Sequence, residues 1–293
     1  MIDAKIETFL AVCEHKSFTK AAEKLCLTQP AVSQHIHYLE KYYQSELFIR
    51  DGRNISLTAA GKLLFASART MKNDEQRLLQ QMHTAQSQKQ YLFGATLTVA
   101  EFILSPILPR FIHAHPNDHI RMQVANTEAL LSALESGEID FAIVEGEFDR
   151  TQYDFLSFSE EEFVAVSTPG QAKLFDGAQL EQLLDQSLIL REKGSGTRAI
   201  LEAALEIKGI SSKQFNNVVE LGSIGAIKKA LIATNQISFM YRAAIQYEEK
   251  TKQLACINIK GFPFYHEVCF VYQKRSTQSE HFHSVFKELI SYR

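Results

Sequence analysis

Two helix-forming patterns lie close together near the N-terminus, in the stretch LCLTQPAVSQHIHYLE of residues 25–40, and they constrain the fold more than any other feature. One apolar pattern with helical spacing ends at Leu25, and the next begins at Val32. Thr28 is placed to cap the second helix, and Pro30 falls in its first turn, where a proline costs no hydrogen bond. With a turn of about three residues between them, the two patterns predict a helix-turn-helix.

The second predicted helix has a polar outer face near its N-terminus. With Val32 and Ile36 facing inward, the residues that face outward are Gln29, Pro30, Ser33, Gln34 and His37. A recognition helix enters the major groove of DNA by its N-terminal end, where Gln pairs with adenine edges and Ser bonds bases or phosphates. A solvated helix face has the same pattern, so this segment alone leaves both interpretations open.

A basic hairpin is predicted directly after these helices, in LFIRDGRNISLT of residues 47–58. Asp51 and Gly52 are a strong two-residue turn signal between two short strands. Arg50 and Arg53 flank the tip, as in a wing whose arginine enters a minor groove. The alternative is a surface hairpin with incidental arginines.

A long helical pattern runs from Thr58 to about Gln90. Its apolar stripe alternates in steps of four and three, interrupted by Glu75, and consists of Leu64, Ala68, Met71, Leu78 and Met82. At about 1.5 Å per residue, such a helix is roughly 45 Å long. The stripe predicts pairing with the same helix of a second subunit, with packing on the chain's own body as the alternative.

The stretch FLAVCEHKSFTKAAEKLCLTQPAVSQHIHYLEKYYQSELFIRDGRNISLTAAGKLL resembles the winged helix-turn-helix of LysR-type transcriptional regulators over about 55 residues. The resemblance rests on Ser-Phe-Thr-x-Ala-Ala, Thr-Gln-Pro-Ala-Val-Ser, Leu-Phe-x-Arg and Leu-Thr-x-x-Gly. It implies double-stranded DNA with two half-sites as a partner, a homodimer through the linker helix, and a homotetramer. The predicted DNA-binding residues are Ser17, Thr19, Thr28, Gln29, Pro30, Ser33, Gln34, His37, Arg50 and Arg53.

Two positions depart from the family pattern. His37 and Tyr38 stand where the family often has Arg or Lys, and YYQSEL lacks the usual glycine before the wing. Because imidazole side chains gain a proton near pH ~6.5 in general, we hypothesise that protonation of His35 or His37 strengthens DNA binding.

The remainder of the chain alternates predicted strands and helices, which is typical of α/β packing. The predicted strands are 95–100, 119–125, 139–144, 162–168, 187–191, 217–221, 236–240, 253–259 and 265–272. The predicted helices are about 104–114, 127–136, 178–184, 197–208, 223–233, 241–248 and 277–291. Nine strands are more than one compact sheet is expected to contain, so we expect this region to form two lobes.

This region resembles the effector domain of the same family, which is built like a periplasmic binding protein. The expected fold is therefore α+β and multidomain: a winged helix-turn-helix, a long linker helix, and a two-lobed α/β effector domain. The expected ranges are 1–58, 59–90 and 91–293, with lobe I at about 91–160 and 266–293 and lobe II at about 161–265.

Ligands of open α/β sheets collect where strands end and helices begin, and several polar residues occupy such places. The predicted effector-binding residues are Thr98, Glu101, Asn126, Thr127, Ser195, Gly196, Thr197, Arg198 and Ser223. The segment REKGSGTR, with its glycines and Arg198, suits a carboxylate or other small anion. Ordinary helix N-caps are the alternative for any single Ser or Thr.

Short matches in TLTVAEF and GSGTR are similar to a subgroup that serves carbon fixation and sulfur assimilation. The family often has Gly-x-Gly-Ile where this chain has ATNQISFMY, so no specific effector is assigned.

Other classes of protein are less well supported by the sequence. Residues 1–90 carry 12 Lys and Arg against 9 Asp and Glu, a balance of +3, and the remainder carries 19 against 25, a balance of −6. A basic head on an acidic body is compatible with a nucleic-acid module. We expect no catalytic site, because phosphate-loop, nucleophile-elbow and zinc-protease motifs are lacking, and a transport-type binding protein would leave the first 90 residues unexplained.

We expect no cofactor and no metal, although His113, His115 and His119 lie close in sequence. The four cysteines form no closely spaced pair, which predicts free, mostly buried thiols. Without a signal peptide pattern or an apolar run of about 18 residues, we expect a cytoplasmic protein and no membrane partner.

Overall fold

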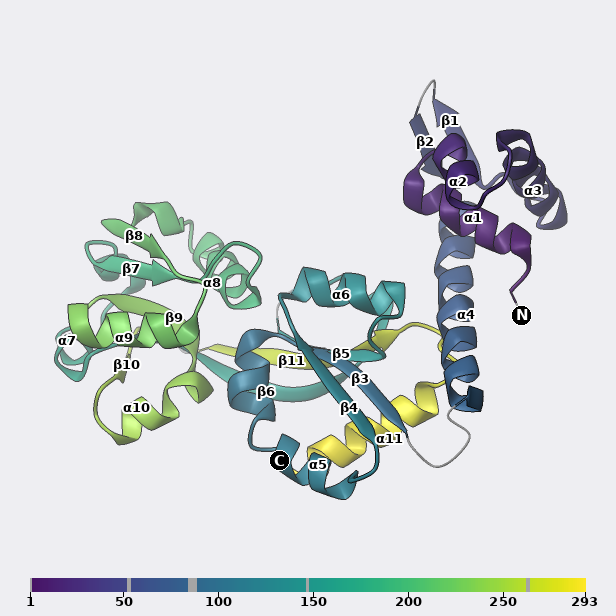
Figure 1. The fold of residues 1–293 in the computed structure, drawn as a ribbon. Coiled ribbons are helices and arrows are strands. Elements are labelled where there is room, and N and C mark those ends of the chain that lie inside the picture. The colour runs from purple at the N-terminus through teal and green to yellow at the C-terminus, as the bar shows by residue number, and fades with distance from the viewer. Residues whose placement is uncertain (1, 52–53, 84–88, 146–147, 262–263) are drawn as a thin grey trace. The chain divides into compact units, whose positions relative to one another are not determined.

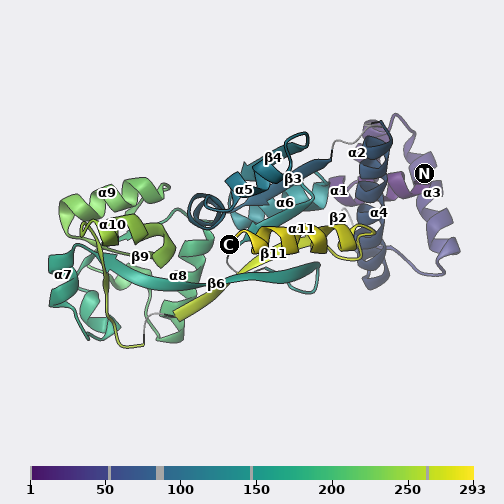
Figure 2. The ribbon, with the colours of Figure 1, turned by 90° about the horizontal axis from the view of Figure 1, so that it is seen from below.

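A computed structural model describes residues 2–51, 54–83, 89–145, 148–261 and 264–293 (Figures 1 and 2). The chain divides into two compact units. The N-terminal unit comprises Met1–Ser87 with Glu135–Gly137 and Lys274–Ser279, and the C-terminal unit comprises Gln88–Leu134, Glu138–Gln273 and Glu280–Arg293.

The N-terminal unit begins with three helices and a two-stranded sheet, as predicted. The helices are α1 (Ala4–His15), α2 (Phe18–Lys24) and α3 (Gln29–Tyr42), and the antiparallel strands are β1 (Phe48–Asp51) and β2 (Asn54–Leu57). The residues with helical spacing form one core, which includes Phe9, Val12, Phe18, Ala21, Val32, Ile36 and Leu39. Burial of this shared stripe fixes α3 against α1 and α2, so the helix-turn-helix prediction is confirmed.

The long helix α4 (Ala59–His83) follows the hairpin. Thr58 caps it, because its Oγ1 accepts a hydrogen bond from the Gly61 amide at 2.9 Å. The described part of the helix ends at His83, residues 84–88 lie outside the described residues, and Gln90, where the helix was predicted to end, is the first residue of a strand.

The predicted stripe on α4 divides into a packed end and an exposed end. Ala68 is buried, and Leu64 packs against the core of the first three helices. Met71, Leu78 and Met82 are 62%, 54% and 67% exposed. The alternative of a helix packed on its own chain therefore accounts for only part of the stripe.

The C-terminal unit contains a nine-stranded sheet. Its strands are β3 (Gln90–Ala95), β4 (His119–Val124), β5 (Phe141–Val144), β6 (Tyr153–Ser167), β7 (Ser187–Leu190), β8 (Asn217–Glu220), β9 (Ile237–Tyr241), β10 (Ala255–Ile257) and β11 (Phe264–Gln273). The order is β4-β3-β5-β11-β6-β9-β7-β8, and β10 pairs with β6. The long antiparallel strands β6 and β11 continue from one half of the unit to the other (Figure 2).

Helices divide this unit into two lobes (Figure 1). Lobe I contains β3 to β5 with the π-helix Val99–Leu104, α5 (Leu108–Ala114), α6 (Thr127–Ser136) and α11 (Ser279–Ser291). Lobe II contains β7 to β10 with α7 (Pro169–Leu174), α8 (Gly196–Ile207), α9 (Ile224–Thr234), α10 (Gln246–Lys250) and 3-10 turns at Leu180–Leu183, Ser212–Gln214 and Arg242–Ile245. Separate hydrophobic cores fill the lobes.

Several predicted elements differ from those observed. The strand predicted at 95–100 was wrong: β3 ends at Ala95, and residues 99–104 form a π-helix. Its buried residues follow a helical pattern rather than strand alternation, namely Val99, Ala100, Ile103 and Leu104. The predicted helix at 178–184 is a 3-10 turn, and α7 was missed because only six residues form it. Among the described residues, no helix is both long enough and apolar enough to span a bilayer.

Candidate functional site

The N-terminal half of α3 has an exposed polar face. Gln29, Pro30, Gln34 and His37 are exposed, and Ser33 is half-buried. The Gln29 Nε2 donates to Ser33 Oγ at 2.9 Å, so these two predicted contacts are joined on the helix surface. The face is free within the described part of the N-terminal unit, as docking into a DNA groove requires.

The helix caps are made by residues predicted to bind DNA. Thr28 Oγ1 accepts from the Ala31 amide at 3.4 Å, and Ser17 Oγ accepts from the Lys20 amide at 3.3 Å. Both therefore have a structural role of the kind that N-caps have, whereas Thr19 is exposed.

The two histidines of α3 have different environments. His35 is half-buried, and its Nδ1 lies 2.8 Å from the hydroxyl of Thr8 on α1, which itself donates to the Ala4 carbonyl. His37 is exposed. The hypothesis that protonation of His35 or His37 strengthens DNA binding stays a prediction.

The hairpin pairs Arg50 with Ile55 across the sheet. Arg53 lies outside the described residues, and so does the side chain of Arg50. Their predicted contacts with phosphates or the minor groove stay predictions.

Sequence reasoning missed an aromatic cluster on the C-terminal half of α3. The exposed rings of Tyr38 and Tyr42 are stacked with centroids 6.4 Å apart, and Tyr43 meets Tyr42 edge-on at 5.1 Å. The ammonium of Lys5 lies 4.7 Å from the centre of the Tyr38 ring. The spacing of the three tyrosines could have predicted the cluster, because Tyr38 and Tyr42 are four residues apart on one helix. The sequence analysis considered Tyr38 only as a departure from the Arg or Lys that the family often has there.

A small cavity of about 210 Å³ lies between the two lobes. It is lined by Thr96, Leu97, Val124, Ala125, Asn126, Glu145, Arg191, Glu192, Ser195 and Gly196. We call it the inner cavity. Its polar residues follow the ends of β3, β4, β5 and β7, which is where open α/β sheets bind ligands.

Glu145 is a buried carboxyl group in the wall of the inner cavity, 2% exposed. Its Oε1 accepts a hydrogen bond from Thr197 Oγ1 at 2.8 Å, and Thr197 Oγ1 lies 3.3 Å from Thr98 Oγ1. Burial raises the pKa of Glu145 to about 7, against the opposing effects of the Thr197 hydrogen bond and the charge of Arg191. Lobes I and II therefore meet at a carboxyl group that is readily protonated at neutral pH.

The close approach of α8 to Glu145 depends on a glycine. A Cβ at Gly196 would lie 2.8 Å from the Glu145 carbonyl oxygen and 2.9 Å from its Cγ. On the other lobe, Thr127 Oγ1 donates to the same carbonyl oxygen at 2.8 Å. The predicted residues Thr127, Gly196 and Thr197 therefore gather around one residue that was not predicted.

Arg191 supplies the positive charge of the inner cavity, and its side chain is 7% exposed. Its Nε and Nη2 donate to the carboxylate of Glu192 at 2.8 and 2.9 Å. Burial alone would raise the pKa of Glu192, but the hydrogen bonds and charge of Arg191 outweigh it and hold that pKa below its usual value. In this two-hydrogen-bond pair, Glu192 binds Nε and Nη2 of the guanidinium group and does not bind the third nitrogen, Nη1.

Arg198, which was predicted to bind the effector, is held by lobe II. Its Nη1 donates to Glu220 at 2.6 Å and to the Arg191 carbonyl at 3.1 Å, and its Nε donates to Glu202 at 3.0 Å. Burial lowers its pKa, yet the two carboxylates together raise it above its usual value. The guanidinium positions Arg191 rather than lining the inner cavity.

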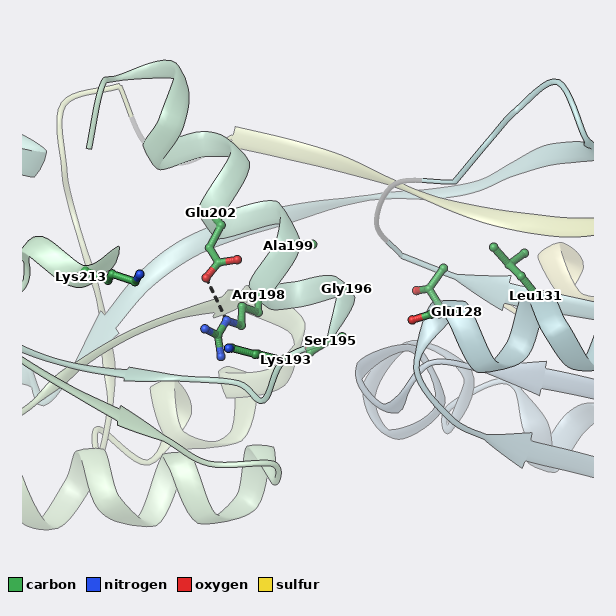
Figure 3. A pocket seen from close by; sticks show the side chains of 11 residues that line it. Glu128, Leu131, Lys193, Ser195, Gly196, Arg198, Ala199, Glu202 and Lys213 are labelled. Carbon is green, nitrogen blue, oxygen red and sulfur yellow. Dashed lines mark hydrogen bonds and ion pairs between the residues drawn. The ribbon is translucent and has the colours of Figure 1, made fainter. Parts of the chain in front are cut away.

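A wider opening of about 570 Å³ adjoins the inner cavity and shares Ser195 and Gly196 with it. Figure 3 shows Lys193, Arg198, Glu202 and Lys213 on the lobe II side and Glu128 and Leu131 on the lobe I side. We call it the outer cavity.

Three residues that line the inner cavity each have a buried side-chain polar atom with no hydrogen-bond partner among the described residues. The atoms are Thr96 Oγ1, Glu145 Oε2 and Arg191 Nη1. Each belongs to a side chain that is more than nine-tenths buried.

The predicted effector residues are thus partly brought together. Asn126, Thr127, Ser195, Gly196 and Arg198 line one or both cavities, and Thr98 and Thr197 hold Glu145. Glu101 is exposed on the π-helix, and Ser223 Oγ caps α9 by accepting from the Ala226 amide at 3.4 Å. Neither lines these cavities, so their role stays a prediction.

Sequence reasoning missed Thr96, Glu145, Arg191 and Glu192. The signal was that Thr96, Glu145 and Arg191 each come directly after a strand, with Glu192 next to Arg191, whereas the sequence prediction rested on helix starts and the glycine-rich segment REKGSGTR.

His115, one of the three histidines considered for a metal, is held by other contacts. His115 Nδ1 lies 2.8 Å from Asp118, and its Nε2 lies 2.8 Å from Glu288. The described residues contain no group of three His, Cys, Asp or Glu side chains placed to hold a metal ion. All four cysteines are free, and Cys26, contrary to the expectation of burial, is exposed in the turn between α2 and α3.

Comparison with known proteins places both units in one family. Residues 85–292 match the family model of the LysR substrate binding domain, and residues 4–62 match that of the bacterial regulatory helix-turn-helix protein, lysR family. The HTH-type transcriptional regulator CysL of Bacillus subtilis is 27% identical over 271 residues, 91% of this chain and 89% of CysL. An HTH-type transcriptional regulator of Methanocaldococcus jannaschii is 32% identical over 237 residues, 78% of this chain and 79% of that protein.

The same fold is present in full-length LysG from Corynebacterium glutamicum, which was solved with bound arginine as effector. The TM-score is 0.68 at 15% identity, and the match covers 99% of each chain. LysR regulators bind DNA and small-molecule effectors, and the relatives found here are regulators rather than enzymes. The N-terminal unit contains a helix-turn-helix, and the C-terminal unit contains a cavity between its lobes. Because the models of one family match both of these regions, the chain belongs to the LysR family of transcriptional regulators.

Proposed function

We propose that this regulator recognises an operator of two half-sites and responds to a small anionic effector bound between the lobes of its C-terminal unit. The observation that carries the effector proposal is Arg191, a buried cation that lines the inner cavity and whose Nη1 has no hydrogen-bond partner among the described residues. Ser195 and Gly196, at the N-terminus of the 12-residue helix α8, line the same space, and helix N-termini favour anions. LysG was solved with arginine bound as its effector. This supports the proposal that a small molecule binds to this fold, but it does not identify the effector of this chain.

The DNA contacts are assigned to the exposed face of α3. Gln34 and Gln29 are placed to read base edges, and Ser33 and His37 lie beside them. The amide groups at the N-terminus of α3 favour phosphates. The domain division 1–58, 59–90 and 91–293 remains part of the proposal, and since DNA is the partner, we expect the protein to act in the cytoplasm.

Assembly is assigned to α4. Its apolar residues Met71, Leu78 and Met82 are exposed over about three turns, and such a stripe is buried by the same helix of a second copy. A dimer presents two copies of α3 to two half-sites, and contacts between C-terminal units would extend the dimer to a tetramer. Effector binding changes the arrangement of subunits only if the effector prefers one arrangement.

A gel shift on DNA upstream of the chain's own gene tests the DNA-binding part. We expect Gln34→Ala to change base preference across a set of operator variants, because a bidentate base contact is worth about 1–3 kcal/mol of discrimination. Gln246→Ala, at an exposed glutamine of lobe II, is the matched control and should change nothing. Unaltered preference in Gln34→Ala would remove α3 as the reading element.

A thermal-shift screen of small carboxylates and phosphates on the whole chain tests the effector part, because a ligand of the folded state raises its melting temperature. We expect Thr197→Val to abolish the response of operator binding to the active compound while DNA binding alone persists. A normal response in that variant would place the effector elsewhere.

A further inference from the structure

We propose that lobe II closes over Glu145 of lobe I with the uptake of one proton from water, so that the two-lobed unit is a proton-sensitive switch. Such a switch needs a carboxyl group that one lobe carries and the other lobe removes from water. Glu145 directly follows β5 of lobe I, and the N-terminus of α8, in lobe II, lies against it. The inference goes beyond the proposed function, because the switch requires neither an effector nor DNA.

The N-terminus of α8 covers the side chain of Glu145. A Cβ at Gly196 would lie 2.9 Å from Glu145 Cγ, so the backbone of lobe II is in close contact with this side chain. From the same turn of α8, Thr197 Oγ1 donates to Glu145 Oε1 at 2.8 Å. With lobe II in this position, Glu145 is 2% exposed. Movement of α8 away from lobe I therefore uncovers the carboxyl group.

The connection between the lobes allows such a movement. The long strands β6 and β11 continue from one lobe to the other, and separate hydrophobic cores fill the lobes. Bending of these strands opens the contact between the lobes without unfolding either core. Leu97 and Phe102 of lobe I pack against a core of lobe II, so opening also parts these apolar contacts. The charge on Glu145 shifts this balance in favour of opening.

The charge on Glu145 makes the covered position less favourable. A carboxylate loses its hydration when it is buried, whereas a neutral carboxyl group loses much less. In the structure, Glu145 Oε1 accepts from Thr197, and Oε2 has no hydrogen-bond partner among the described residues. The lost hydration is thus only partly replaced. The closed form, in which lobe II covers Glu145, therefore binds a proton more tightly than the open form.

Burial has the largest effect on Glu145, and it outweighs the charged group nearby. It raises the pKa of Glu145 to about 7, although the Thr197 hydrogen bond and the charge of Arg191 lower that pKa. Arg191 is itself paired with Glu192 at 2.8 Å. On β9, Tyr241 is a neutral phenol, because burial and the charge of Glu145 raise its pKa. The other groups placed around Glu145 are uncharged and belong to Thr98, Thr127, Gly196 and Thr197.

The direction and size of the effect follow from proton linkage. The pKa of Glu145 is about 7 in the closed form and near its ordinary value of 4.5 when water reaches it. Closing therefore takes up a proton between these two pH values, and acid favours the closed form. Between pH 5.5 and pH 8.5, the ratio of closed to open forms should fall roughly thirtyfold.

Spin labels on opposite sides of the outer cavity measure the separation of the lobes. Glu128 of lobe I and Lys213 of lobe II line that cavity and are exposed (Figure 3). Both are replaced by cysteine in the full chain, and the exposed Cys26 is replaced by serine. The labelled chain is mixed with an excess of unlabelled chain, so that each assembly contains one labelled copy. Double electron–electron resonance then gives the distance distribution at pH 5.5 and pH 8.5, and the Cys26→Ser chain alone gives the background.

Three variants in the labelled chain define the closed form, the open form and the control. Glu145→Gln still accepts from Thr197 but never ionises, so it should keep the closed distance at both pH values. Gly196→Ala places a methyl group 2.8 Å from the Glu145 carbonyl oxygen, so it should hold the lobes apart at both pH values. Glu101→Gln removes an exposed carboxyl group of lobe I and should keep the response to pH. The melting temperature of each variant checks its folding.

The chain with native Glu145 should have the distance of Glu145→Gln at pH 5.5 and move toward that of Gly196→Ala at pH 8.5. Identical distributions at the two pH values overturn the proposal, and so does a pH-dependent change that persists in Glu145→Gln. Because the measurement contains neither effector nor DNA, a failure of the proposed function leaves its result unchanged. That failure is detected separately, as operator binding that responds to no small anion.

Discussion

Replacement of Glu145 by glutamine should stabilise the ligand-free protein at high pH and have little effect at low pH. The buried carboxyl group has a pKa of about 7 in the folded protein against an ordinary value of 4.5. Glutamine retains an oxygen that accepts from Thr197 but never ionises. The variant therefore removes the cost of burying a carboxylate and keeps the hydrogen bond.

The sign and size follow from proton linkage. Because the folded-state pKa is raised, the folded protein binds more protons than the unfolded chain between pH 4.5 and 7. Glu145 thus contributes its full stability below pH 4.5 and loses it as the pH rises to about 7. The rise of the pKa from 4.5 to about 7 corresponds to at most roughly 3–4 kcal/mol, since each pKa unit is worth about 1.4 kcal/mol.

Urea unfolding of both proteins between pH 5 and 8 measures this difference directly, because other titrating groups cancel between them. The free energy of unfolding of Glu145→Gln should exceed that of the wild type increasingly up to about pH 7 and then by a constant amount. For a compact unit of about 200 residues, a difference of about 3 kcal/mol in unfolding free energy corresponds to a difference of roughly 6–12 °C in melting temperature.

Glu192→Gln is the matched control, with the opposite sign. The Glu192 pKa is lowered, so its contribution is present at high pH and is lost as the pH falls. That variant should be less stable than the wild type at pH 8, with a gap that narrows on acidification. A difference between Glu145→Gln and the wild type that does not vary with pH would refute the reasoning about the buried carboxyl group.

Three further predictions concern the N-terminal unit. Gln44, with φ of +50°, occupies the left-handed region that favours glycine, so Gln44→Gly should raise the unfolding free energy by up to about 1 kcal/mol, as measured in urea, and Gln44→Ala should not. Leu78→Asp should convert a dimer to monomers in sedimentation velocity, whereas the same change at exposed Ile112 on α5 should not. His37→Gln should abolish any gain in operator affinity between pH 8 and pH 6 in gel shifts, and an undiminished gain would exclude His37.

The sequence predicted the N-terminal unit well because its signals are local. Val32, Ile36 and Leu39 share one helix face, and their spacing alone predicts which residues are buried. Thr28 and Thr58 cap the helices for which they were predicted. In such a small unit, each helix packs on its immediate neighbours in the chain, so periodicity is sufficient.

The inner cavity could be predicted only in part because its contacts are distant in the chain. Glu145 and Thr197 are 52 residues apart, and no local pattern pairs them. Arg198 is an error of the opposite kind, a residue that was predicted to bind an anion but has other partners. Its position beside glycines at a helix start suggested an anion site. In the structure, Glu202 and Glu220 bind its guanidinium group instead. Residue type and local position identify candidates, whereas the partner that each one keeps depends on the tertiary fold.

The misassigned strand at 95–100 bears on how a ligand would be sensed. The segment that lines the inner cavity at Thr96 continues into the π-helix Val99–Leu104, a rare element that is frequent at functional sites. From that helix, Phe102 packs against the core of lobe II, where its ring centre lies 5.0 Å from the ammonium of Lys228 on α9. A ligand in contact with this segment therefore touches residues that pack against both lobes. Its binding energy then depends on how the two lobes are placed. A regulatory ligand requires such a dependence, because it must bind one arrangement more tightly than another.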